Sequence, residues 1–133
     1  MRLLAIVSAQ FAVGFWLVGI AAAQPAPLPE QPDSTIGYPT VDAALAGLHA
    51  KPGVVFSTNR GWTIAVDETS RTIWSFAPPD SHAYPAAVKR QVAPAVGGGS
   101  TIEMTVLCDG PKAACDDLVR TFQQLNAQVG RGR

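Results

Sequence analysis

Short runs in which apolar and polar residues alternate occupy the middle of the chain. In the run from 62 to 67, Trp62, Ile64 and Val66 alternate with Thr63, Ala65 and Asp67. This two-residue period is typical of a β-strand with one buried face. Turn residues separate this run from four others of β-rich composition, which are Val54–Thr58, Thr72–Ala77, Ala87–Ala93 and Thr101–Cys108. The pattern predicts an antiparallel sheet of four to five strands.

Two segments with helical periodicity flank these runs. Pro39-Thr40 opens the first, with Thr40 as the expected N-cap, and Lys51-Pro52-Gly53 ends it. The second begins at Pro111 and repeats its apolar residues at steps of three and four, at Cys115, Leu118, Phe122, Leu125 and Val129. We therefore predict an α+β fold in which the N-terminal and the C-terminal helix both pack on one face of the sheet.

The first 23 residues have the three parts of a secretory signal peptide. Arg2 is the basic start, Leu3–Ile20 is apolar, and Ala21–Ala23 offers small side chains for cleavage before Gln24. The apolar stretch is also long enough for an uncleaved membrane anchor. The sequence therefore predicts a periplasmic or secreted protein, with an inner-membrane anchored form as the alternative.

The rest of the chain has room for one domain. Residues 24–38 contain four prolines and predict an extended linker. Residues 39–129 are expected to form a single α+β domain, and residues 130–133 a short flexible tail. Lys and Arg total 10 and so do Asp and Glu, which gives a formal net charge of zero. Because Lys and Arg are scattered, we expect no nucleic-acid partner.

The two cysteines, Cys108 and Cys115, fit an exported chain. An even number of cysteines in a short exported protein favours a disulfide, and this spacing differs from that of redox-active pairs. Neither of the two histidines, His49 and His82, has a partner at metal-ligand spacing. No metal site and no cofactor is therefore expected.

Aromatic residues mark the most distinctive part of the predicted sheet. Trp62, Trp74 and Phe76 lie on neighbouring strands, and the loop from Pro78 to Pro85 follows them with His82 and Tyr84. Such a surface suits a sugar, a proline-rich peptide or an apolar ligand. The alternative is that the tryptophans belong to the core.

The same loop supplies the residue types of a hydrolase, because Asp80, Ser81, His82 and Tyr84 lie close together in it. Catalytic groups usually converge from separate backbone positions, and the Gly-x-Ser-x-Gly turn is absent from the sequence. We therefore assign no catalytic residue and favour a non-enzymatic binding or interaction domain. A small envelope hydrolase and a membrane-tethered structural protein are the alternatives.

Several short segments resemble short exported proteins of uncharacterised type from Gram-negative bacteria. These are Tyr38-Pro39-Thr40-Val41, Gly61-Trp62, Trp74-Ser75-Phe76 with Pro78-Pro79, Cys108, and Cys115-Asp116-Asp117-Leu118-Val119. The resemblance implies an envelope location and brings no activity with it. The expected partner is an envelope protein or ligand, and the sequence leaves its identity and the oligomeric state open.

Overall fold

The computed structural model describes residues 36–131. The predicted signal peptide, residues 24–35 of the predicted linker and the last two residues lie outside the described residues. The described part comprises the predicted domain and the short segment that leads into it.

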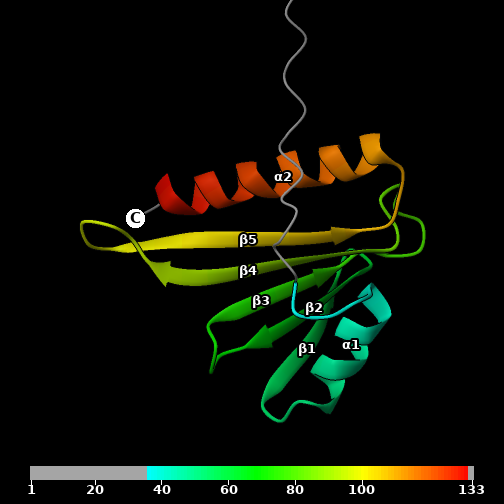
Figure 1. The fold of residues 1–133 in the computed structure, drawn as a ribbon, viewed down its shortest axis with the longest axis horizontal. Helices are drawn as coiled ribbons and strands as arrows, with labels where there is room; N and C mark the ends of the chain where they lie inside the picture. The colour runs from blue at the N-terminus through cyan, green and yellow to red at the C-terminus, as the bar shows by residue number, and fades with distance from the viewer. Residues whose placement is uncertain (1–35, 132–133) are drawn as a thin grey trace, which may run out of the picture.

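The domain is a five-stranded antiparallel sheet with one helix before it and one after it. In chain order the elements are α1 (Val41–Ala50), β1 (Val54–Asn59), β2 (Trp62–Asp67), β3 (Thr72–Phe76), β4 (Ala86–Pro94), β5 (Ser100–Cys108) and α2 (Lys112–Arg131). Each strand pairs with the next along the chain, in the order β1-β2-β3-β4-β5 (Figure 1). The predicted α+β class and the antiparallel sheet are confirmed.

Local sequence explains where the elements begin and end. The Thr40 hydroxyl accepts a hydrogen bond from the Ala43 N–H at 3.0 Å, which caps α1 as predicted. Gly53 lies after α1 with φ +82, a conformation that glycine adopts without steric cost. Arg60 and Gly61 connect β1 to β2 with positive φ at both positions, as a tight hairpin turn requires.

The helices pack on opposite faces of the sheet, so the prediction that both cover one face is wrong. Ala87 and Val88 are consecutive in β4 and therefore point to opposite faces. Ala87 packs in the cluster that contains α1, and Val88 in the cluster that contains Leu118 and Phe122 of α2. Figure 1 shows α1 beside β1 and α2 along β5, at the two ends of the strand order.

The central strand β3 has buried side chains on both of its faces. Trp74 is 4% exposed on the α1 side, and Ser75 is 2% exposed on the α2 side. On the α1 side three fully buried alanines, Ala44, Ala65 and Ala87, allow close approach of helix and sheet. Buried side chains on both faces of one strand need a covering layer on each side of the sheet.

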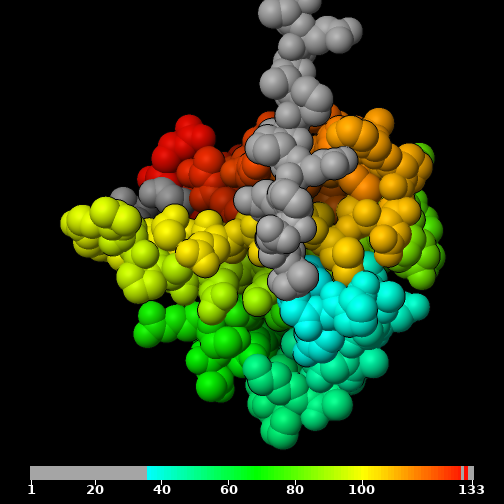
Figure 2. Space-filling view, viewed as in Figure 1, coloured from blue at the N-terminus to red at the C-terminus, as the bar shows by residue number. Residues whose placement is uncertain are grey.

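The turn between β4 and β5 projects from the body of the molecule (Figure 2). Val96 at this turn is fully exposed, and Gly97, Gly98 and Gly99 follow it with positive φ. This hairpin end lies outside both core clusters.

Candidate binding hollow

A shallow, open hollow of about 630 Å³ lies on the α2 side of the domain. Three segments line it, which are the β1–β2 turn with the start of β2, the loop after β3, and the first half of α2. The residues are Arg60, Trp62, Pro78, Asp80, Ser81, His82, Ala83, Ala114, Asp117, Leu118 and Thr121. We call this site the Trp62 hollow.

The Trp62 side chain is held by α2. Its ring lies 5.7 Å from the ring of Phe122 at an interplanar angle of 60°, within the range of favourable aromatic pairs. Phe122 is 7% exposed, as is Leu118, whereas Trp62 is only partly buried. Trp62 therefore rests on the core with one side and borders the hollow with the other.

The loop that forms the second wall is built from turns stabilised by backbone hydrogen bonds. The Ser81 N–H donates to the Pro78 carbonyl at 2.9 Å, and the Tyr84 N–H donates to the Ser81 carbonyl at 3.1 Å. The Asp109 N–H donates to the Pro85 carbonyl at 2.9 Å, which ties the end of the loop to the segment after β5. These bonds position the His82 side chain from a fixed backbone.

Gly110 permits close contact between this loop and the segment that leads into α2. A Cβ atom at residue 110 would lie 2.7 Å from the Ala83 carbonyl oxygen, which is closer than two non-bonded atoms can approach without movement. Glycine is therefore required here by the approach of two backbones. The segment before α2 thus supports the loop that lines the hollow.

The predicted disulfide links the sheet to the third wall. Cys108 at the end of β5 is bonded to Cys115 in α2, with a Cα–Cα distance of 5.9 Å. The first half of α2 is thereby fixed to the strand from which it departs. The residues of α2 that line the hollow lie at positions 114, 117, 118 and 121, within two turns of this bond.

Charges of both signs surround the apolar part of the hollow. Arg60 lies at one wall, Asp80 on the loop, and Asp117 on α2, where it also pairs with Arg120. Mixed charges at a rim disfavour a strongly anionic or cationic ligand. Trp62, Pro78 and Leu118 provide the apolar surface between them.

Lys51, Asp67 and Arg90 have pKa values that their surroundings in the fold shift. A hydrogen bond from Lys51 lowers the pKa of the buried Asp67 carboxyl, and the same bond raises the pKa of Lys51. Burial lowers the pKa of Arg90, whose guanidinium lies 5.3 Å from the centre of the Phe122 ring. The Lys51–Asp67 pair joins the end of α1 to β2. Arg90 joins β4 to α2 through its contact with Phe122.

The structure separates the five residues that we predicted as a binding surface. Trp62 and His82 line the hollow together. Tyr84 is 44% exposed and lies outside its lining. Trp74 and Phe76 are each 4% exposed in the cluster under α1, so they belong to the core and not to a ligand surface.

The hydrolase alternative receives no geometric support from the loop. The Ser81 hydroxyl accepts a hydrogen bond from the Ala83 N–H at 3.3 Å. Within residues 36–131 no hydrogen bond joins His82 to Ser81 or Asp80. The described residues also contain no cluster of three His, Cys, Asp or Glu side chains that would hold a metal ion.

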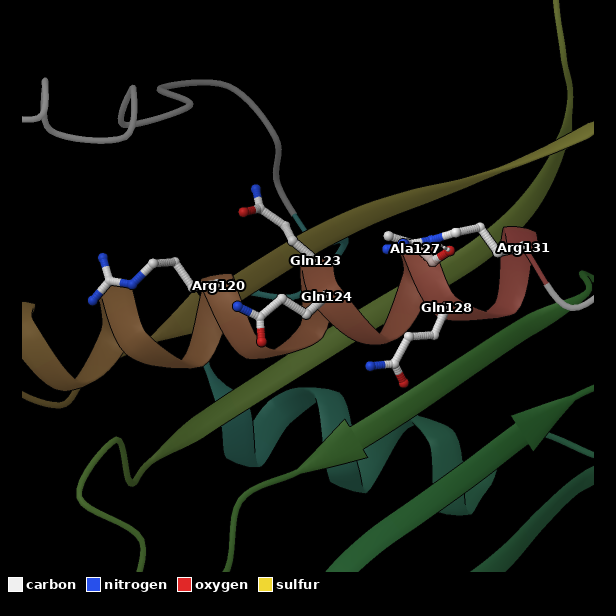
Figure 3. A pocket seen from close by; sticks show the side chains of 6 residues that line it. All are labelled: Arg120, Gln123, Gln124, Ala127, Gln128 and Arg131. Atoms are coloured by element: carbon white, nitrogen blue, oxygen red, sulfur yellow. Dashed lines mark hydrogen bonds between the residues drawn. The ribbon is translucent and has the colours of Figure 1, made fainter.

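A second shallow depression, of about 350 Å³, lies on the outer surface of α2. Figure 3 shows its six side chains projecting from one helix, which are Arg120, Gln123, Gln124, Ala127, Gln128 and Arg131. Among the described residues, α2 alone lines it. Exposed Gln and Arg on one helix face are typical of a solvated surface.

Sequence reasoning missed the α2 wall of the hollow. Ala114, Asp117, Leu118 and Thr121 follow one another at steps of one to three residues over two turns, so they share one flank of the helix. The spacing of these four residues can be read from the sequence. Their proximity to Trp62 cannot, because it depends on which face of the sheet α2 covers.

Comparison of the chain with protein-family models, with curated proteins and with solved structures finds no match. Among the helices in residues 36–131, none has the length and apolar character needed to cross a membrane.

Proposed function

We propose that this protein is an exported, non-enzymatic interaction domain that binds a proline-containing peptide segment of an envelope partner in the Trp62 hollow. The observation that carries the proposal is the partly buried Trp62, whose ring is held against Phe122 and borders the hollow together with Pro78. An aromatic side chain fixed in this way loses little conformational entropy when it binds.

The chemistry of the hollow favours an extended peptide. Proline-rich segments dock on grooves lined by aromatic side chains because their backbone is already extended before binding. Trp62 offers such a side chain with a donor N–H, and Leu118 and Pro78 continue its apolar surface. Arg60 and Asp117 lie on different walls of the hollow. Arg60 could donate hydrogen bonds to peptide carbonyl groups, and the Asp117 carboxylate could accept them from peptide N–H groups.

The proposed location rests on the disulfide. Cys108 and Cys115 are bonded, which suggests an oxidising compartment such as the periplasm or the extracellular space. Together with the signal peptide expected over residues 1–23, this supports export. The bond also supports the binding proposal, because it holds α2 in the position that forms one wall.

The test is a selection of displayed peptides on the oxidised protein, followed by affinity measurement of the enriched sequences. We expect the selection to enrich proline-containing peptides of modest affinity. Trp62→Ala and His82→Ala should each weaken the binding of these peptides by about tenfold or more, as expected for residues at the centre of a peptide site. Oligosaccharides and small apolar compounds, tested in parallel, should bind less well.

Two matched substitutions serve as controls. Trp74→Phe changes the tryptophan in the core, and His49→Ala removes the other histidine, which stacks on Phe56 on the α1 side. Both should leave peptide affinity unchanged. Tighter binding of the oligosaccharides than of the selected peptides, or an equal loss of peptide affinity with His49→Ala and His82→Ala, would refute a peptide site in the hollow.

A further inference from the structure

Each helix covers only part of its face of the sheet, and the two uncovered parts differ in chemistry. On the α1 side, the cluster under the helix centres on β1, β2 and β3. The same face of β4 and β5 carries polar side chains, which are Lys89, Gln91, Glu103 and Thr105. Such a surface is stable in water without a partner.

On the α2 side, the uncovered part is apolar. The cluster under α2 includes residues of β4 and β5, while the same face of β1, β2 and β3 presents Val55, Ile64, Val66 and Ile73. None of these four belongs to either core cluster. Val55 is 63% exposed and Ile73 38% exposed. Adjacent apolar side chains at a surface often mark an interface.

Val55 lies on β1, which is an edge strand of the sheet. Edge strands are usually protected by a charged residue, a proline, a bulge or a covering segment. β1 contains no charged residue and no proline, and its six residues pair with β2 in unbroken register. Among the described residues, no backbone hydrogen bond outside the sheet reaches β1.

The opposite edge is different. A helix packs against each edge strand, α1 against β1 and α2 against β5, so the helices do not distinguish the two edges. β5 carries the charged Glu103, and a charge on an edge strand opposes the addition of another strand. The unprotected edge and the most exposed strand valine therefore occur together, on β1 alone.

We infer that the protein forms a two-fold symmetric dimer in which β1 pairs antiparallel with β1 of a second copy. Antiparallel pairing of a strand with its own copy is self-complementary under two-fold symmetry. It supplies partners for the outward backbone groups of β1 and continues the sheet. The lack of charge in β1 means that no like charges meet in the pair.

This pairing also accounts for the exposed valine. The two-fold axis lies perpendicular to the joined sheet, so the α2-side faces of both copies lie on the same side. Val55 of each copy then lies beside the other's β1 strand and loses much of its exposure. The Trp62 hollow is lined by the turn, the loop and α2, so dimer formation and peptide binding are separate properties.

The test is sedimentation of the full chain, expressed with its N-terminal segment and purified as the cell processes it, over a wide range of concentration. We expect a monomer–dimer equilibrium. Val55→Lys and Ser57→Lys place charges on exposed positions of β1, and each should raise the dimer dissociation constant by about tenfold or more.

Val96→Lys is the matched control, because Val96 is fully exposed at the β4–β5 turn, far from β1 in the strand order. It should leave the dimer intact, and circular dichroism should show that all three variants keep the fold. A wild-type chain that stays monomeric would overturn the inference. So would a dimer that persists in both folded β1 variants, or one that Val96→Lys dissociates equally.

Discussion

The two faces of the sheet hold one tryptophan each, and the two tryptophans have different surroundings. On the α1 side, Trp74 is 4% exposed, stacks on Phe76 at 6.2 Å and meets the edge of Tyr38 at 5.8 Å. On the α2 side, Trp62 contacts Phe122 and borders an open hollow. The same residue type thus serves the core on one face and a surface on the other.

This difference shows that residue type alone does not distinguish a core residue from one that borders a surface hollow. Trp62 and Trp74 look alike in the sequence, each at a strand with apolar neighbours. Strand alternation assigns them to opposite faces, because Ala65 pairs with Trp74 while Trp62 shares its face with Ile64. What then separates them is how closely a helix covers each face.

The largest effect that we expect is the loss of the tryptophan on the α1 side. Trp74→Ala should lower the free energy of unfolding by about 3–5 kcal/mol, because it leaves a cavity under α1. Trp62→Ala should cost about 1–2 kcal/mol, since its ring is only partly buried. Denaturant unfolding of both variants measures the two values, and equal losses would contradict the difference between the faces.

The next effect concerns the bond between the sheet and α2. Replacing Cys108 and Cys115 by alanine should lower stability by about 2 kcal/mol, the value expected for a short closed loop. Because the bond holds the α2 wall, peptide affinity at the hollow should fall as well. Thermal unfolding and peptide titration check the two effects, and a loss of stability with unchanged affinity would show that α2 keeps its place without the bond.

A smaller effect is expected from Gly110→Ala. The added methyl group meets the Ala83 backbone, and its accommodation should cost about 1–2 kcal/mol. The movement would shift the loop of the Trp62 hollow and leave the α1 side unchanged. Amide chemical shifts should therefore change around residues 78–85 and not in α1. Changes in α1 of the same size would show that the two sides are coupled.

The smallest effect is the pH dependence from the Lys51–Asp67 ion pair on the α1 side. The bond lowers the Asp67 pKa below its ordinary value of 3.8, so the folded state binds the proton less readily than the unfolded state. The stabilisation is complete above the ordinary pKa and disappears as pH falls through the folded pKa. The Lys51 side chain is 47% exposed, so solvent screens the pair.

Denaturant midpoints measured between about pH 7 and pH 2 check this dependence. Asp67→Asn should flatten the acid decline, whereas Asp116→Asn, in the exposed pair with Lys112, should not. An unchanged decline in Asp67→Asn would exclude this carboxyl as its source.

Much of the fold could be predicted because it is encoded locally. The alternation in Trp62–Asp67, the cap at Thr40 and the apolar stripe of α2 each specify an element without reference to the rest of the chain. The disulfide could be predicted from the number and spacing of the cysteines. These predictions needed only neighbouring residues.

The arrangement of the layers could not be obtained in this way. Ala65 and Asp67 suggested an exposed face of β2, yet both are buried, Ala65 under α1 and Asp67 beside Lys51. A small or paired polar residue can face a core, so alternation alone did not reveal the second covered face. Because the sequence does not show which helix covers which face, Trp74 and Phe76 were predicted as site residues. For the same reason the α2 wall of the hollow was not predicted.

The central claim is that the α2 side binds a peptide at Trp62 while the α1 side supports the fold. Nuclear magnetic resonance of the indole N–H groups of Trp62 and Trp74, during titration with a selected proline-containing peptide, tests it most directly. We predict that the Trp62 signal shifts with saturation and that the Trp74 signal stays in place. A shift confined to Trp74, or saturable binding that moves neither signal, would contradict the account.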